Sequence, residues 1–160
     1  MVIHASRAHL DELLERIPDT IDFDVDEDSD CRDLGDWLEQ TLRKELGLAC
    51  VARDDDGAIP IPLGDNVVYI HQGDADAEFV TVSALLAEGF EPSIEVYEAV
   101  NAINLHTPLA KTVFEADQVF TTVDLPIIDT LSPDDLMLAI DIVGGVAERF
   151  GARLQTRFVA

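Results

Sequence analysis

The stretch EVYEAVNAINLHTPLAKTVFEADQVFTTVDLP, residues 95–126, decides the fold of this chain. Its first part carries apolar residues at helical spacing behind Pro92, which predicts a helix from Pro92 to about Leu105. Two apolar runs follow, 109–115 and 118–126, and they predict two strands joined by a tight turn. A helix that leads into a β-hairpin places the chain among the α+β proteins.

Upstream of this stretch, the sequence predicts a helix and an antiparallel meander. The helix covers about 30–46 and ends at Gly47, a typical residue just beyond a helix C-terminus. Apolar runs separated by turn residues then predict three or four strands. These runs are 48–53, 59–62, 66–71 and 78–83. Pro60 and Pro62 lack N–H donors, so the second run belongs at a sheet edge or in a bulge.

The chain closes with a long amphipathic helix. Ser132, Pro133 and Asp135 supply its N-cap, a first-turn proline and the acid of a capping box. Its buried stripe is predicted to be Leu136, Ile140, Val143, Ala147, Phe150 and Leu154. Gly144 and Gly145 lie in mid-helix, where each costs about 1 kcal/mol relative to alanine. We therefore expect a close backbone approach there, either by packing within the chain or by a dimer contact.

The first 30 residues differ from the rest, and we expect two parts: an N-terminal helix with an acidic linker at 1–30, and an α+β domain at 31–160. Leucines at helical spacing predict a short helix over 7–17, which Pro18 ends. An acidic segment follows at 19–30. It is interpreted as a solvated linker or an edge strand, with cation binding as the alternative.

The acidic segment only partly matches a calcium-binding loop. Asp22, Asp24 and Asp26 occupy the first, third and fifth positions of the EF-hand spacing. Glu27 stands where a glycine makes the sharp turn, and Asp33 stands where a glutamate should complete the ligand shell. These two departures favour the linker interpretation over a calcium site.

Charge and apolar patterning limit the classes of partner and the location. The chain has 33 acidic and 10 basic residues and a net charge of -23, which disfavours nucleic acid and anionic membrane surfaces. A basic or amphipathic protein segment would suit such a surface. The apolar runs are too short to cross a bilayer, and charged residues interrupt the first 17 residues where a secretory signal would be apolar. We therefore expect a cytoplasmic protein.

Motifs for catalysis, metals or cofactors are lacking in the sequence. There is no nucleophile elbow, phosphate-binding loop or dinucleotide fingerprint. The four histidines have no metal-site spacing, and Cys31 and Cys50 are too few for a disulfide scaffold. The sequence therefore predicts a protein that is not an enzyme and has no cofactor, with a hydrolase based on paired acids as a remote alternative.

Three segments carry a resemblance to a known family: ARDDDGAIPIPLGDNVVYI at 52–70, VNAINLHTPLAKTVFEADQVFTTVDLPI at 100–127, and LSPDDLMLAIDIVGGVAERFGARL at 131–154. Because these segments also occur in the family's order and spacing, the chain resembles, over about 34–158, the class I type III secretion chaperones and YbjN-like proteins. These are grouped as TY-Chap domains. The resemblance implies an antiparallel sheet flanked by helices, in the order helix, β-meander, helix, β-hairpin, helix. It also implies a non-enzymatic, chaperone-like module that binds a peptide or protein. The alternative function is a sensory or regulatory protein that responds to cations through its acidic surface.

The candidate peptide-binding residues are Phe114, Phe120, Val123, Asn101 and Asn104. The resemblance identifies Asn101 and Asn104 as the asparagines that end the middle helix, where they either satisfy local backbone or contact a ligand. Strand alternation puts one residue of each apolar pair toward the helices and the other on the opposite face. A partner segment would lie on that exposed face or pair with a sheet edge, and the same surface could join two copies of the chain as a homodimer.

Overall fold

The computed structural model describes residues 34–73, 78–127 and 131–158. All of them belong to one compact unit, Arg32–Ala160. The helix predicted over 7–17 and the acidic segment 19–30 lie outside the described residues.

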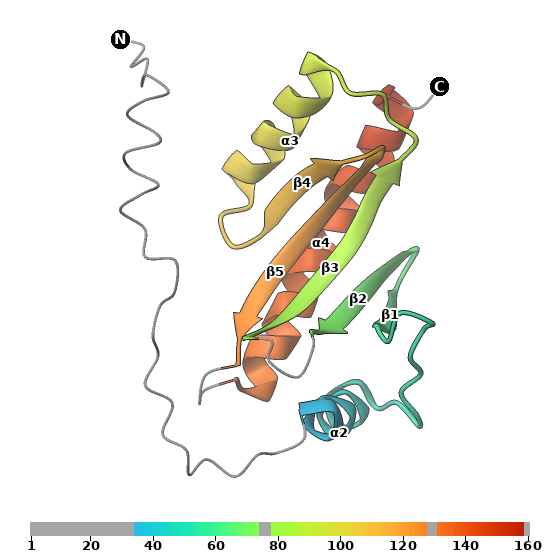
Figure 1. Cartoon of the computed structure of the whole chain (residues 1–160), viewed down its shortest axis with the longest axis vertical. Coiled ribbons are helices and arrows are strands. Elements are labelled where there is room, and N and C mark those ends of the chain that lie inside the picture. The colour runs from blue at the N-terminus through green and yellow to red at the C-terminus, as the bar shows by residue number, and fades with distance from the viewer. Residues whose placement is uncertain (1–33, 74–77, 128–130, 159–160) are drawn as a thin grey trace. The chain divides into compact units, whose positions relative to one another are not determined.

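The described residues form three helices and a five-stranded antiparallel sheet (Figure 1). The strand order is β1-β2-β3-β5-β4, so the meander and the later hairpin join through the β3–β5 pair. This architecture confirms the predicted α+β fold and its order of elements. The elements are α2 (Leu34–Leu46), β1 (Ile59–Leu63), β2 (Asn66–Gln72), β3 (Phe79–Glu88), α3 (Ile94–His106), β4 (Lys111–Glu115), β5 (Gln118–Pro126) and α4 (Pro133–Phe158).

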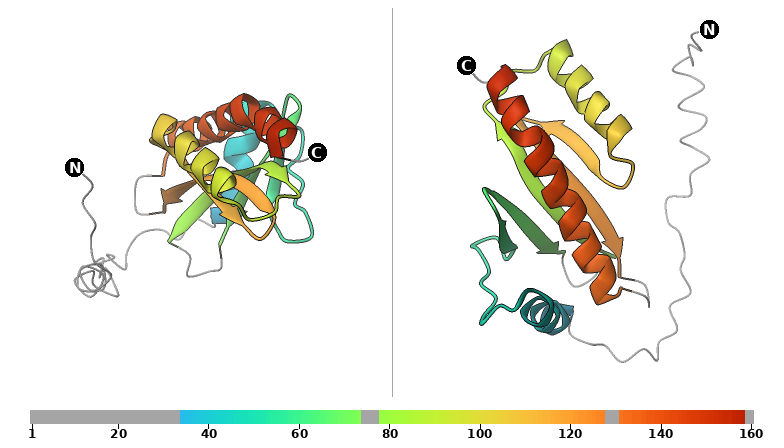
Figure 2. Two further views of the ribbon diagram at one scale, coloured as in Figure 1. Left: turned by 90° about the horizontal axis from the view of Figure 1, so that it is seen from above. Right: turned by 180° about the vertical axis from the view of Figure 1, so that it is seen from behind.

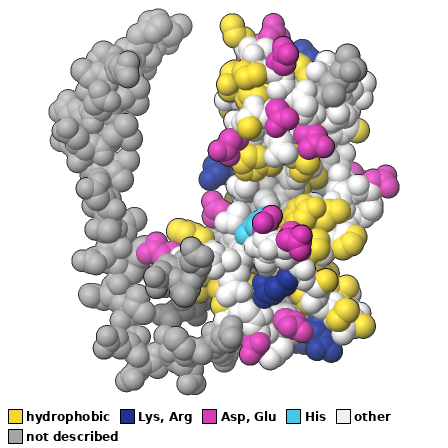
Figure 3. Space-filling view, turned by 45° about the vertical axis from the view of Figure 1, so that its right-hand side comes forward, with side chains coloured by type: hydrophobic (Ala, Val, Ile, Leu, Met, Phe, Trp, Pro, Cys, Tyr) yellow, Lys and Arg dark blue, Asp and Glu magenta, His cyan; other side chains and the backbone are white. Residues whose placement is uncertain are grey.

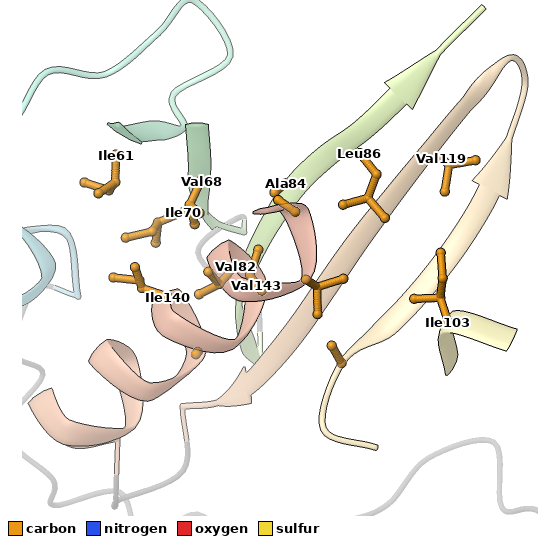
Figure 4. Packing of buried hydrophobic residues seen from close by; sticks show 14 of the residues in the cluster. Ile61, Val68, Ile70, Val82, Ala84, Leu86, Ile103, Val119, Ile140 and Val143 are labelled. Carbon is orange, nitrogen blue, oxygen red and sulfur yellow. The ribbon is translucent and has the colours of Figure 1, made fainter. Parts of the chain in front are cut away.

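Helix α4 covers one face of the sheet, where it packs on β2, β3 and β5 (Figures 1 and 2). Helix α3 lies beside β4, and α2 contacts α4. The core forms between α4 and the strand residues that alternate toward it, such as Val82 and Ala84 of β3 (Figure 4). Ile140 and Val143 of α4 are almost fully buried against this face. The opposite face of the sheet receives no helix from the described part of the chain.

The capping box predicted at the start of α4 is present. The Ser132 hydroxyl accepts a hydrogen bond from the Asp135 N–H at 3.2 Å, and the Asp135 carboxylate accepts one from the Ser132 N–H at 3.2 Å. The same carboxylate accepts a hydrogen bond from the Ser132 hydroxyl at 2.7 Å. These bonds to the Ser132 side chain and backbone lower the pKa of Asp135 below its usual 3.8. The cap therefore defines the residue at which α4 begins.

Two glycines let α4 approach the sheet closely. A Cβ on Gly144 would lie 2.8 Å from Leu63 Cδ1, and one on Gly151 would lie 3.0 Å from the carbonyl oxygen of Leu86. The first contact confirms packing within the chain as the reason for a glycine at 144. Gly145 is different, because a Cβ there would have no atom within 4 Å.

The predicted strand at 48–53 is wrong, because this segment is irregular. Asp54 ends it with a tight turn: its carboxylate accepts hydrogen bonds from the N–H groups of Asp56 and Ala58, at 3.1 and 2.8 Å. The Ala58 N–H is thus bonded to a side chain and is not available for a ladder with 48–53. Leu48 and Val51 still pack against the core, which explains their apolar character.

Two predicted boundaries also change. Strand β3 continues to Glu88, beyond the predicted end at Ser83, because it pairs with β5 along its whole length through an irregularity between Leu85 and Ala87. Helix α3 begins at Ile94 with Ser93 as its N-cap, so Pro92 precedes the helix and does not occupy its first turn.

Two of the α4 glycines, Gly145 and Gly151, give a direct test of this packing. Gly145→Ala should raise the free energy of unfolding by about 0.5–1 kcal/mol, because alanine is the better helix former and its Cβ meets no atom. Gly151→Ala should lower the free energy of unfolding, although alanine brings the same gain in helix propensity. The new Cβ would press on the carbonyl of Leu86, which lies in a central strand and cannot move aside cheaply. Urea unfolding of the two variants measures both changes. Equal effects would contradict the close approach at Gly151.

Candidate functional site

The open face of the sheet carries an apolar row across three strands. Leu85 of β3 lies opposite Phe120 of β5, and Phe120 lies opposite Val113 of β4. Leu85 is 41% exposed, while Phe120 and Val113 are partly buried. We call Leu85, Phe120 and Val113 the apolar row. Its side chains point away from α4, because their strand neighbours Ala84 and Val119 are buried in the core.

Polar residues border the apolar row on both sides. Toward the turn between β4 and β5, the neighbouring row on the same face consists of Glu88, Gln118 and Glu115. The amide of Gln118 donates a hydrogen bond to the carboxylate of Glu88 at 3.4 Å. Farther along on the other side, Asp124 accepts a hydrogen bond from Thr81 at 2.9 Å and pairs with Lys111 at 3.4 Å. The row is thus a narrow apolar strip between groups that carry more negative than positive charge. Figure 3 shows the surface obliquely, with apolar patches separated by acidic side chains.

The β1 edge of the sheet is poorly suited to pair with a further strand. Leu63 and Asn66 flank a two-residue turn and pair with each other, so Pro60 and Pro62 take the positions whose backbone points outward. Proline has no N–H, and the outward side of β1 therefore offers no donor at either position. This confirms the predicted edge location of the two prolines and gives it a physical role.

The β4 edge is occupied by a side chain. The Asn104 amide donates a hydrogen bond to the carbonyl of Thr112 at 3.0 Å, and its carbonyl oxygen accepts one from the Thr112 N–H at 2.7 Å. The amide thus engages Thr112 as the peptide group of a neighbouring strand would. It fixes the end of α3 to β4 and takes the outward groups of Thr112 from any added strand.

The structure brings only some of the predicted site residues together. Phe120 lies on the open face, whereas Val123 faces α4 and packs against the core. Phe114 also lies on the helical side, where its ring is 5.4 Å from that of Tyr97 and 6.4 Å from that of Phe90. Asn101 is exposed on α3, one turn before Asn104.

Leu85 and Val113 of the apolar row are residues that the sequence reasoning missed. Leu85 falls beyond the predicted end of its strand, although the alternation from Phe79 continues through Thr81 and Ser83 to Leu85. Phe79 lies on the same face and is 47% exposed. Following that alternation past Ser83 would have identified Leu85.

Within the described residues, no group of three His, Cys, Asp or Glu side chains lies close enough to hold a metal ion. None of the helices in the same part of the chain has the length and apolar character needed to span a bilayer.

Comparison with known proteins identifies the family. Residues 32–159 match the model of TY-Chap1, described as the "T3SS (YopN, CesT) and YbjN peptide-binding chaperone 1" family. The match covers most of the chain, so the chain belongs to this family of peptide-binding chaperones, as the sequence resemblance predicted. The family is of a non-enzymatic type. No protein among the curated sequences matches the chain.

Solved structures with the same fold include a chaperone–effector complex. The HopA1–SchA chaperone–effector complex aligns with a TM-score of 0.58 at 13% identity, over 74% of this chain and 93% of that chain. The ExsC–ExsE complex aligns with a TM-score of 0.60 at 14% identity, over 76% and 96%. YbjN from E. coli aligns with a TM-score of 0.57 at 18% identity, over 74% and 91%. At these identities the likeness establishes the fold alone.

Replacing Asn104 tests its structural role. Asn104→Ala removes both hydrogen bonds to Thr112, and we expect the free energy of unfolding to fall by about 1–3 kcal/mol because the part-buried Thr112 groups lose their partners. Asn101→Ala on the same helix is the matched control and should change stability little. Urea unfolding measures both. If the two variants were equally stable, Asn104 would not hold α3 to β4.

Proposed function

We propose that this chain is a chaperone-like module that binds a segment of a partner protein on the open face of its sheet and catalyses no reaction. The observation that supports this most directly is the apolar row, which lies on the one sheet face that the described helices leave uncovered and includes the 41% exposed Leu85. Family membership supports peptide binding by this chain. We propose that the chain carries out this role in the cytoplasm.

The partner segment should contact side chains of the face and should not extend the sheet. Addition of a strand needs a row of free N–H and C=O groups. Pro60 and Pro62 remove donors at one edge, and Asn104 engages Thr112 at the other. Affinity would then come from burial of Leu85 and Phe120, where a fully buried side chain of this size contributes about 1.5–3 kcal/mol.

The charge around the apolar row favours a partner segment that is basic and amphipathic. Glu88, Glu115 and Asp124 lie on the open face, and Lys111 offsets only one of them. The net charge of -23 extends this preference over a longer range. Apolar side chains would thus contact the row while Lys or Arg side chains face the neighbouring acids.

We further propose a homodimer that forms through helix α3. Three apolar residues lie on one side of α3 at intervals of three and eight residues. They are Ile94, Tyr97 and Leu105, which are 74%, 55% and 76% exposed. Asn101 lies on the same stripe, and Leu109 just beyond the helix is 67% exposed. Exposed apolar side chains gathered on one side of a helix are typical of a surface that another copy covers.

Leu85→Asp should abolish most binding at the apolar row. The charge replaces an apolar contact and adds to the surrounding acids, so affinity for a captured partner should fall by about 10- to 100-fold. The measurement is a pull-down from native cytoplasm with mass spectrometry, followed by titration of the enriched protein. Leu138→Asp, on an exposed position of α4, is the matched control. Equal capture by both variants would exclude the open face as the binding site.

Leu105→Asp should convert the dimer to a monomer. A twofold interface contains each residue twice, so the substitution acts twice and should weaken association at least about 100-fold. Light scattering coupled to size-exclusion chromatography measures the mass, with Leu138→Asp as control. A monomeric wild-type chain, or a dimer that survives Leu105→Asp, would refute the α3 interface.

A further inference from the structure

A half-open cavity of about 330 Å³ lies between α3 and the last turns of α4, on the helical side of the sheet. Arg149, Arg153 and Arg157 line it, and they follow one another at intervals of four residues along α4. A second row runs beside them, one residue further on at each step: Phe150, Leu154 and Phe158. We call this cavity the arginine groove. It has a cationic row and an apolar row side by side.

The three arginines are an exception to the charge of the chain. They are three of only ten basic residues in a chain with 33 acidic ones. Arg43, Lys44 and Lys111 pair with carboxylates, whereas none of the groove arginines lies within 4.0 Å of a carboxylate in the described part of the chain. Arg149 and Arg157 instead lie over the rings of Phe150 and Phe158, at 5.1 and 5.2 Å.

Support of the α4 C-terminus does not account for this arrangement. Cations stabilise the last turn of a helix through its dipole, and only Arg157 lies in that turn. Arg153 precedes it by about one turn and Arg149 by about two. Their unpaired charges beside an apolar floor therefore suit a ligand that supplies both carboxylates and apolar groups.

We propose that the arginine groove binds an amphipathic helical segment of a partner protein that carries a row of acidic residues beside a row of apolar ones. Residues four apart on a helix lie about 6 Å apart along its axis, so acids at every fourth position of the partner match the arginine spacing. Ala99 and Ala102 of α3 form the opposite wall, and their small side chains leave room for a third helix. A long polyanion is disfavoured because the net charge of -23 would repel the part of it that extends beyond the groove.

This site is separate from the open face, so its partner segment differs in charge from the basic one expected there. The two surfaces could bind different segments of one partner or two partners. Binding in the arginine groove does not depend on binding at the apolar row. Arg153→Glu tests the groove, and Leu85→Asp tests the apolar row.

The test uses the full chain and a labelled amphipathic peptide of about 15 residues, long enough to form a helix on binding. The peptide carries glutamate at every fourth position and leucine one position further on. Fluorescence anisotropy should show saturable binding that weakens as salt is raised. Arg153→Glu should reduce the affinity for the peptide about tenfold. Arg43→Glu, at an exposed position of α2, is the matched control and should leave that affinity unchanged.

A charge exchange makes the test specific. The Arg153→Glu chain should bind a peptide with lysine at the central acidic position better than the wild-type chain does, and circular dichroism should confirm that the variant is folded. Leu85→Asp should leave binding in the groove intact, which separates failure here from failure at the open face. The proposal is wrong if a glutamine version of the peptide binds as well as the glutamate one, or if Arg153→Glu and Arg43→Glu act alike. Binding of anionic vesicles in place of the peptide would also overturn it.

Discussion

The close packing of α4 on one face of the sheet is the constraint on which the rest of the structure depends. Gly151 lets the helix axis approach β3, and Gly144 makes room for Leu63 of β1. The helix thereby buries the inward side chains of β2, β3 and β5 in one layer. Because no described helix packs on the other face of the sheet, that face remains available for function.

The sheet also limits how a partner can bind. A five-stranded open sheet has two edges, and an unprotected edge invites strand addition or aggregation. Here proline removes donors from β1, and the Asn104 side chain engages β4 in the manner of a strand. We propose that binding is then directed to side chains, at the apolar row on the open face and at the arginine groove between α3 and α4. The first is bordered by acids and the second is lined by arginines, so charge would distinguish the two proposed ligands.

Features encoded by adjacent residues could be predicted from the sequence. The capping box at Ser132 and the edge prolines depend on local chemistry, and both are present. The strand at 48–53 was predicted wrongly: the outward side of β1 offers no N–H at Pro60 or Pro62 with which a further strand could pair. The pairing of Asn104 with Thr112, and the meeting of α3 with the α4 arginines, arise only when distant elements pack. Strand alternation predicts that Phe120 and Val119 lie on opposite faces of the sheet. Only the position of α4 decides which of the two faces is open.

Binding through the open face is tested most directly by NMR mapping of a bound partner segment on the labelled chain. The resonances of the Leu85 methyls and the Phe120 ring should shift on binding, while the Thr112 amide keeps its hydrogen bond and its exchange rate. New protection of backbone amides along β1 or β4, with Leu85 and Phe120 unchanged, would show that the partner extends the sheet. That result would contradict the claim that the chain binds through its open face.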